Sequence, residues 1–303
     1  METGTKRIVA IVLIVVIGIG IGVGAWVFLS QPESKIKYPG APSSRPNTIV
    51  IGFTGDLGEI QGDGNYEGGY FAAKTINEAG GFEVGGETYY IGVAKEDTDE
   101  SNPALVTSRG VAAARRLIYD REVDFGIGGF RSEALLAYVE EFMDAEMIFI
   151  DTGASTDIFC QNVRDDYANY RWFFRFMPIN STSLGGQIFN TLGTYLPPLD
   201  QAYPNHDILQ VGILAEDLTW TAGLVGGIVY YLPLIANGTS MALYGVPMAV
   251  EVLTPILYDV SLSAADMNTH LQTLASQGAD FVIPLISAQG GVLMMQQYSQ
   301  YEY

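Results

Sequence analysis

Residues 49–155 alternate short apolar runs with longer helical ones, and this alternation constrains the fold more than any other feature of the chain. Strand-like runs stand at IVIGF (Ile49–Phe53), before KEDTDESNP (Lys95–Pro103), at VDFGIGGF (Val123–Phe130) and at MIFIDTGAS (Met147–Ser155). Strands that alternate with helices of this length predict a parallel α/β sheet. Small and hydroxyl residues follow these strands, at the sheet edge where such folds bind small ligands.

A second series of strands and helices follows Ser155. Arg171–Phe176 can form a strand, and a helix from Ser183 to Leu196 is expected to stop at Pro197. The later strands are expected at Ile208–Ala215, Gly245–Leu253 and Ala279–Ile286, and the helices at Leu218–Leu232, Ser263–Gln277 and Gly290–Tyr298. We therefore predict two α/β lobes, 49–175 and 176–303, hinged around residues 172–182. Three strands against four in the first lobe indicate that the second lobe is incomplete, as in a truncated reading frame.

The N-terminus carries a candidate membrane segment. Residues Ile8–Leu29 are apolar and uncharged, and at ~1.5 Å per residue they can cross a ~30 Å hydrocarbon core. Lys6 and Arg7 precede the segment, so the positive-inside rule leaves the folded part extracellular or periplasmic on a single-pass cell-membrane anchor. A cleaved secretory signal is the alternative, although no clear small-x-small cleavage site follows. Residues 1–30 are thus an anchor or signal segment, and the Pro-, Ser- and Lys-rich residues 31–48 a flexible linker.

Composition excludes several functions. A net charge of −19 argues against nucleic acid as a partner and against docking on anionic lipid. Cys160 is the single cysteine, so no disulfide can form within the chain. His206 and His270 stand beside no Ser or Cys in a catalytic arrangement, and Asp97 with Asp99 is too small a carboxylate group for calcium. We expect no enzyme activity, no metal and no cofactor.

Four motifs point to a known family. They are Ile51–Phe53 with its loop, INEAGG (Ile76–Gly81), Asp97–Asp99 with Asn102 and Pro103, and the whole run Gly128–Ser155. With them the chain resembles, from Ile49 to about Tyr298, type I periplasmic-binding-fold proteins, close to the leucine/isoleucine/valine-binding proteins of ABC transporters. The resemblance implies two lobes that close on a solute, a branched-chain amino acid or its amide, and an ABC permease as partner.

The resemblance also implies a binding site. In the family a serine, a threonine and a backbone N–H hold the ligand α-carboxylate, and these positions fall on Ser132, Ser155 and Gly153. Trp220 falls where an aromatic side chain covers the ligand, and Ser287 replaces a second tyrosine. The family's acidic partner of the ligand ammonium would lie beyond Tyr303.

The residues themselves leave alternatives open. Ser132 can cap the helix Glu133–Met143 or contact the ligand, and Arg131 can bind a carboxylate or lie on the surface. Trp220 can stack on a solute or belong to the core, and Asp217 can meet an ammonium group or cap a helix. Residues 153–155 can line a ligand or form an ordinary turn. The predicted ligand-binding set is Arg131, Ser132, Gly153, Ala154, Ser155, Asp217, Trp220 and Ser287.

Three functions compete at this point. The leading one is a membrane-tethered solute receptor that serves an ABC importer, and the second is the ligand-sensing ectodomain of a signalling receptor. A nucleotide-dependent enzyme is the third, but it lacks both GxGxxG between strand and helix and GxxxxGK[ST]. The sequence does not identify the solute, the oligomeric state or the use of the glycosylation sequons at Asn180 and Asn237.

Overall fold

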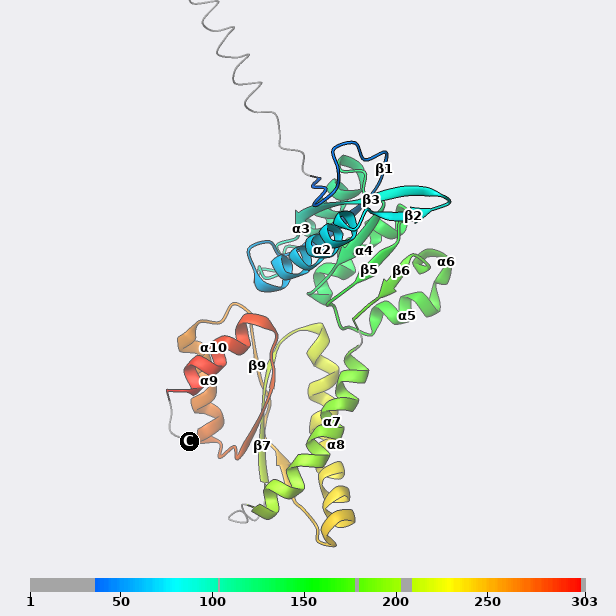
Figure 1. Cartoon of the computed structure of the whole chain (residues 1–303). Coiled ribbons are helices and arrows are strands. Elements are labelled where there is room, and N and C mark those ends of the chain that lie inside the picture. The colour runs from blue at the N-terminus through cyan, green and yellow to red at the C-terminus, as the bar shows by residue number, and fades with distance from the viewer. Residues whose placement is uncertain (1–35, 103, 178–179, 203–208, 301–303) are drawn as a thin grey trace, which may run out of the picture. The chain divides into compact units, whose positions relative to one another are not determined.

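The computed structural model describes residues 36–102, 104–177, 180–202 and 209–300 (Figure 1). The predicted anchor or signal segment at 1–30 lies outside the described residues. From Tyr38 onward the chain forms one compact unit.

The first sheet has six strands in the order β2-β3-β1-β4-β5-β6. Every neighbouring pair is parallel except β2 with β3, which is antiparallel. This confirms the predicted parallel α/β arrangement, to which the structure adds the short hairpin strand β2. The strand bounds are β1 (Asn47–Gly55), β2 (Phe82–Val84), β3 (Glu87–Asp97), β4 (Phe125–Gly128), β5 (Phe149–Asp151) and β6 (Phe173–Arg175).

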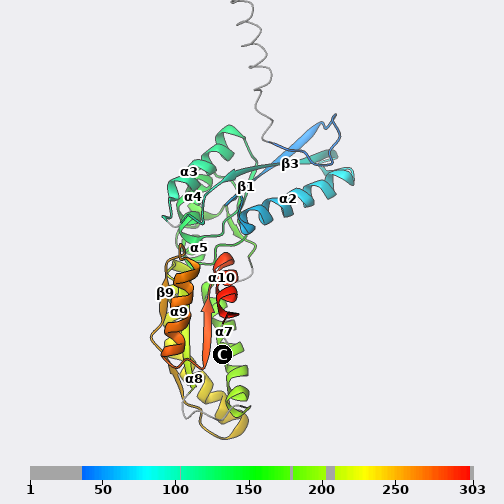
Figure 2. The same ribbon diagram turned by 90° about the vertical axis from the view of Figure 1, so that its left-hand side faces the viewer.

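Helices cover both faces of this sheet. Helix α2 lies on one face, whereas α3 and α4 lie on the other (Figure 2). Phe53, Tyr66 and Val93 form the core under α2, and Leu135, Phe142 and Phe149 are fully buried on the α4 side. The helix bounds are α2 (Ile60–Glu78), α3 (Thr107–Arg115) with the π-helical turn η1 (Arg116–Asp120), α4 (Ser132–Asp144), α5 (Ile158–Asp165) and α6 (Tyr167–Tyr170).

The folded part begins earlier than the sequence predicted. Residues 38–48 were expected to belong to a flexible linker, with folding from Ile49. Instead the Asn77 side-chain amide donates to the carbonyl oxygen of Pro39 at 2.7 Å, and the Arg45 guanidinium lies 3.9 Å from the Tyr38 ring centroid. The buried side-chain amide of Asn77 thus fixes residues 38–48, a segment that has no hydrophobic period of its own.

The second sheet is parallel and is built around β7. The order is β10-β7-β8, and β9 also pairs with β7, beyond the point where β8 ends. Four strands are therefore present where three were predicted. Their bounds are β7 (Leu209–Glu216), β8 (Val250–Val252), β9 (Ile256–Tyr258) and β10 (Phe281–Leu285).

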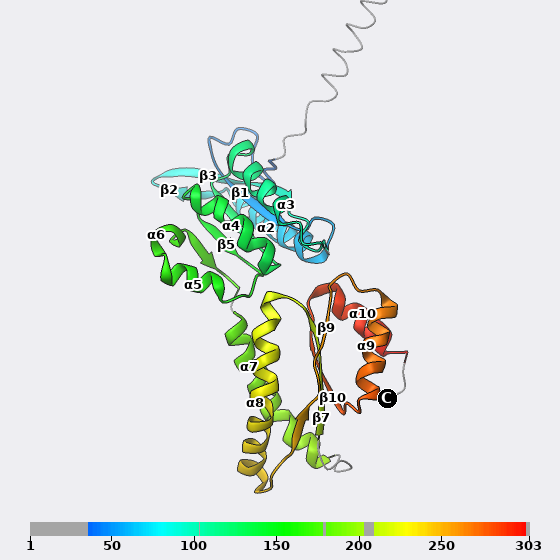
Figure 3. The ribbon, with the colours of Figure 1, turned by 180° about the vertical axis from the view of Figure 1, so that it is seen from behind.

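Two pairs of helices enclose this sheet (Figure 3). Leu196, Leu232 and Ala236 from α7 and α8 pack on Val211 and Ile213 of β7 in one core. A second core forms on the opposite face, from Leu214, Met267, Leu271, Leu274 and Met294. The helix bounds are α7 (Ser181–Ala202), α8 (Thr219–Tyr244), α9 (Ala264–Ser276) and α10 (Ala288–Tyr298).

Two predicted helix ends were wrong. Helix α7 continues through Pro197 to Ala202. Helix α8 passes Pro233 and ends at Tyr244, and its C-cap Gly245 has a left-handed φ of 72°. A proline inside a helix loses one hydrogen bond, but Leu196, Leu232 and Ala236 are fully buried on either side of these prolines. Packing of the apolar face supplies most of a helix's stability, so it outweighs the local preference here.

Helix α8 is the one described helix that is long and apolar enough to cross a membrane by length and composition. Its buried residues recur every three or four positions, at Thr221, Leu224, Ile228, Leu232, Ala236 and Ser240. Leu224, Ile228, Leu232 and Ala236 of this stripe pack on β7 in the core described above.

Candidate ligand-binding site

The carboxyl ends of β1, β3, β4 and β5 meet at one edge of the first sheet, as parallel strands require. The ends of these strands and the loops after them carry three buried acids, Asp56, Glu100 and Asp151, all at most 5% exposed. A buried carboxylate is costly unless hydrogen bonds compensate it. Each of the three is compensated by the N–H groups of a strand-end loop, which shows how this edge is held in place.

Glu100 joins the β3–α3 loop to the start of α4. Its Oε2 accepts the backbone N–H of Phe130 at 3.0 Å and of Arg131 at 2.6 Å. Its Oε1 accepts the hydroxyls of Thr98 and Tyr138, both at 2.9 Å. Burial raises the pKa of Glu100, and the four hydrogen bonds oppose that rise. The N–H groups of the two residues that precede α4 are therefore already occupied by a protein carboxylate.

Asp56, in the loop after β1, and Asp151, the last residue of β5, also accept N–H groups of strand-end loops. Asp56 accepts both the N–H and the hydroxyl of Ser101, and the former bond measures 2.7 Å. Asp151 Oδ1 accepts the N–H of Gly153 at 3.1 Å and of Ala154 at 2.9 Å, while Oδ2 pairs with Arg175 at 3.0 Å. The Gly153 N–H, which the resemblance assigned to the ligand, thus donates to Asp151 in this structure, and Ala154 is fully buried.

Arg131 is a buried cation at the N-cap position of α4. Its exposed fraction is 7%, so the alternative of a surface arginine is wrong. The guanidinium Nη1 is buried and has no hydrogen-bond partner among the described residues. A buried donor without a hydrogen-bond partner is costly, which makes Arg131 a candidate for binding an anionic group.

The two predicted serines differ in accessibility. The hydroxyl of Ser132 is buried and accepts the N–H of Thr156 at 3.3 Å. Helix α4 begins at Ser132 itself with Arg131 as its N-cap, so the alternative that Ser132 caps the helix is wrong. Ser155 lines a cavity with Arg131, and its carbonyl oxygen accepts the N–H of Ser181 at 2.7 Å.

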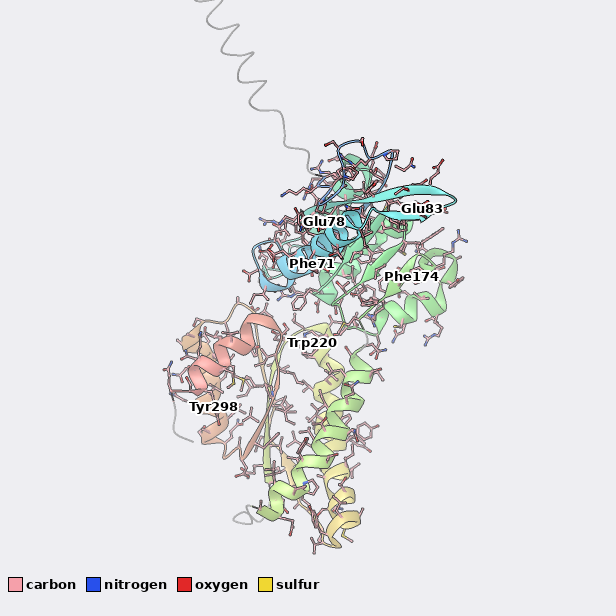
Figure 4. The ribbon with its side chains drawn as sticks, in the orientation of Figure 1. Phe71, Glu78, Glu83, Phe174, Trp220 and Tyr298 are labelled. Atoms are coloured by element: carbon pink, nitrogen blue, oxygen red, sulfur yellow. The ribbon has the colours of Figure 1, made fainter. Side chains whose placement is uncertain are left out.

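The second lobe contributes a buried acid, Glu216, at the end of β7. Its carboxylate accepts the N–H of Ser287 at 3.1 Å, the Ser287 hydroxyl at 2.8 Å, and Trp220 Nε1 at 3.3 Å. Burial raises the pKa of Glu216, while these bonds and the positive charge of Arg131 lower it. Burial and the nearby Glu216 also raise the pKa of Tyr258. Figure 4 shows the Trp220 side chain at the first turn of α8.

The sequence predicted Asp217 as the acidic residue of the site, whereas the buried acid is its neighbour Glu216. The Asp217 side chain is exposed, and α8 takes Leu218 as its N-cap, so Asp217 does not cap it. All but one residue of β7 are buried, so no polar alternation revealed which acid faces inward. A carboxylate on the last residue of an otherwise apolar strand was the available signal.

Two adjoining cavities bring residues of both lobes together. One of about 170 Å³ is lined by Phe130, Arg131, Gly153, Ser155, Met177, Leu184, Leu218, Trp220 and Ser287. The other, of about 200 Å³, is lined by Glu59, Gln61, Ser101, Phe130, Arg131, Glu216, Tyr258, Val260, Ser287 and Gly290. Arg131, Gly153, Ser155, Trp220 and Ser287 of the predicted set thus share this region, whereas Ser132, Ala154 and Asp217 line neither cavity.

Metal-binding clusters of three or more His, Cys, Asp or Glu are absent from the described residues. Asp97 accepts the N–H of Leu57 at 3.1 Å, and Asp99 pairs with Arg109 at 2.7 Å, so both acids hold loops. The ring centroids of His270 and Tyr258 lie 6.2 Å apart, with the two rings tilted by 33°. His206 lies outside the described residues.

Neither a protein-family model nor a curated protein matches this chain. Solved structures do match, at 16–17% identity over 84% of the chain. An extracellular ligand-binding receptor from Rhodopseudomonas palustris HaA2 has a TM-score of 0.59. A solute-binding protein of an ABC transporter from R. palustris BisB5, in complex with 3,4-dihydroxybenzoic acid, has 0.55. An ABC transporter substrate-binding protein from Desulfitobacterium hafniense, in complex with Leu, has 0.50.

These matches establish the fold. The chain has the α/β periplasmic-binding fold of these binding proteins, as the sequence motifs indicated. It spans 59%, 58% and 63% of the three matched chains, which is less than two thirds of their length.

Proposed function

We propose that this chain is an extracytoplasmic solute-binding receptor that captures a small amino-acid-like ligand between its lobes for an ABC importer. The observation that carries the proposal is a pair of opposite buried charges, Arg131 and Glu216, which line the same 200 Å³ cavity. A zwitterion presents a carboxylate and an ammonium group, and these match the two charges.

The carboxylate would lie against Arg131. Its Nη1 lacks a partner among the described residues, and a guanidinium forms strong charge-assisted hydrogen bonds with carboxylates. Ser155, in the adjoining 170 Å³ cavity, would add a hydroxyl donor. Ser132 would contribute less directly, because its hydroxyl is engaged with Thr156, although a hydroxyl that accepts one bond can also donate another.

The ammonium group would lie against Glu216. That carboxylate already holds Ser287 and Trp220, and a carboxylate offers about four lone-pair sites in all. Trp220 is half-buried in the 170 Å³ cavity, where it would cover the apolar part of the ligand. Asp217, which is exposed, would play no direct part.

A hydrogen bond between the lobes supports closure around a ligand. The backbone N–H of Thr219, in the first turn of α8, donates to Glu133 Oε1 of α4 at 2.6 Å. This bond joins the two helices whose N-terminal ends carry Arg131 and Trp220. It would favour the closed arrangement, in which both charges face one solute.

We further propose the division into lobes at 49–175 and 176–303, since β6 ends at Arg175 and α7 begins at Ser181. The segment before the folded unit would attach it to the membrane, and an ABC permease would receive the solute. The related structures support the ligand class only by likeness: one is in complex with Leu and one with 3,4-dihydroxybenzoic acid.

Isothermal titration tests the proposal. The protein is titrated with the twenty amino acids, with hydroxybenzoates, and with sugars. We expect at least one amino acid to bind at micromolar or tighter affinity, about −8 kcal/mol. Binding of hydroxybenzoates or sugars in the absence of amino-acid binding would contradict it.

A further inference from the structure

A third cavity, of about 230 Å³, lies within the first lobe at the same sheet edge. The loops after β1, β4 and β5 and the first turns of α2 line it. Phe130 lines this cavity and both cavities described above, and Gly153 and Gln61 are each shared with one of them. A ligand whose charged groups lie between Arg131 and Glu216 can therefore extend a side chain into this space.

The cavity contains an amide with no partner. Both the nitrogen and the oxygen of the Gln61 side chain are buried and make no hydrogen bond among the described residues. Leaving buried polar atoms unpaired is costly, so such atoms are usually satisfied by ordered water or by a bound ligand. An amide offers both a donor and an acceptor, and its complement is a group with both.

Two other polar side chains of the wall, Asn65 and Thr152, are held by long hydrogen bonds. Asn65 donates to the Thr54 carbonyl oxygen at 3.4 Å, and Thr152 donates to Asn65 Oδ1 at 3.4 Å. These distances are longer than the usual 2.7–3.2 Å, so a ligand can compete for either group. Gly153 and Gly129 also line the cavity, and their backbones pack closely. A Cβ atom added to Gly153 would lie 2.5 Å from the carbonyl oxygen of Gly129, so no larger residue fits at position 153.

We propose that this cavity binds the ligand's side chain and selects a neutral group that both donates and accepts hydrogen bonds, as a carboxamide does. The proposal rests on the proposed function and narrows its solute class. An aliphatic side chain would leave Gln61 unpaired. An anionic one would meet the buried carboxylate of Asp56, which lines the same cavity.

Near-isosteric amino acids test this specificity. The full chain is titrated calorimetrically with asparagine and glutamine, with leucine and norleucine, and with aspartate and glutamate. We expect the better carboxamide to bind at least about tenfold tighter than the better aliphatic or acidic amino acid, since two hydrogen bonds are gained.

Gln61→Met keeps an unbranched side chain of similar length and removes the amide. We expect it to lose the carboxamide preference about tenfold, whereas Gln187→Met, on the exposed face of α7, leaves the preference unchanged. Thermal melting checks whether both variants fold. If Gln61→Met does not fold, the order of affinities that the wild-type protein shows for the three pairs of amino acids decides alone. A wild-type preference for aliphatic or acidic ligands, or a preference that survives Gln61→Met, overturns this inference and leaves the proposed function standing. If no amino acid binds, both are wrong.

Discussion

The acidic residues at the strand ends of the first sheet have hydrogen-bond partners within the protein, whereas the Nη1 atom of Arg131 has none among the described residues. Asp56, Glu100 and Asp151 are each satisfied by backbone N–H groups of the loops. Arg131 is equally buried, and its Nη1 lacks a partner among the described residues. The acids therefore hold the strand-end loops, and in the proposed function the arginine meets the ligand.

Replacing the two serines separates binding from folding. Ser155→Ala removes a cavity-lining hydroxyl and should weaken amino-acid binding about ten- to a hundredfold, because a hydrogen bond to a charged group contributes ~1.5–3 kcal/mol. Ser132→Ala removes the acceptor of the Thr156 N–H and should lower the free energy of unfolding by about 1 kcal/mol. Dissociation constants and melting temperatures are measured for both. Unchanged affinity in Ser155→Ala would remove that serine from the site.

Glu100 should give stability a particular dependence on pH. Because burial raises its pKa in the folded state above the ordinary 4.5, the folded protein binds this proton more tightly than the unfolded chain does. The contribution to stability is therefore fully present below that ordinary value and is lost as the pH rises through the raised pKa. In Glu100→Gln this loss is absent, since an amide can donate to the Thr98 and Tyr138 hydroxyls.

Urea unfolding at pH 4.5 and pH 7 measures the effect. The wild-type protein should lose stability relative to Glu100→Gln as the pH rises, whereas Glu67→Gln, at an exposed position of α2, should follow the wild type. A difference between wild type and Glu100→Gln that does not change with pH would contradict the account.

At the scale of elements, the α7–α8 layer depends on one buried stripe. Leu232 is fully buried against β7, and Leu234, two residues on, is 60% exposed. Leu232→Ala should lower the free energy of unfolding by about 2–5 kcal/mol, because it leaves a cavity in the core. Leu234→Ala should change it by about 0.5 kcal/mol or less. Chemical denaturation of both compares them directly, and similar losses would show that α8 does not pack as described.

The elements that the sequence predicted well are those that a regular pattern specifies. The alternation of apolar strands and helices gave both parallel sheets. Pro197 misled, because its local effect is overridden by tertiary packing around Leu196. Asp217 misled because β7 is buried on both faces, so no alternation distinguished it from Glu216. The sequence could not predict the unpaired amide of Gln61, since its pairing depends on which polar groups of the folded protein come within hydrogen-bond distance.

At the scale of the whole chain, the N-terminal apolar run should keep the folded part attached to the membrane and outside the cell. Lys6 and Arg7 precede that run, and the positive-inside rule predicts that this end stays in the cytoplasm. Protease added to intact cells should then digest the domain that begins at Tyr38, while a cytoplasmic marker protein survives. Protection of the domain until the cells are lysed would contradict this topology.

The central claim is that one solute meets both Arg131 and Glu216, and charge-deleted ligands test it most directly. The tightest-binding amino acid is compared by calorimetry with its des-amino acid and its decarboxylated amine. For leucine these are 4-methylpentanoate and 3-methylbutylamine. Each deletion should weaken binding about ten- to a hundredfold, since each removes a charge-assisted hydrogen bond worth ~1.5–3 kcal/mol. In the Glu216→Gln variant the des-amino acid and the amino acid should bind with similar affinity, because the carboxylate that meets the ammonium group is gone. A des-amino acid that binds the wild-type protein as tightly as the amino acid would contradict the account.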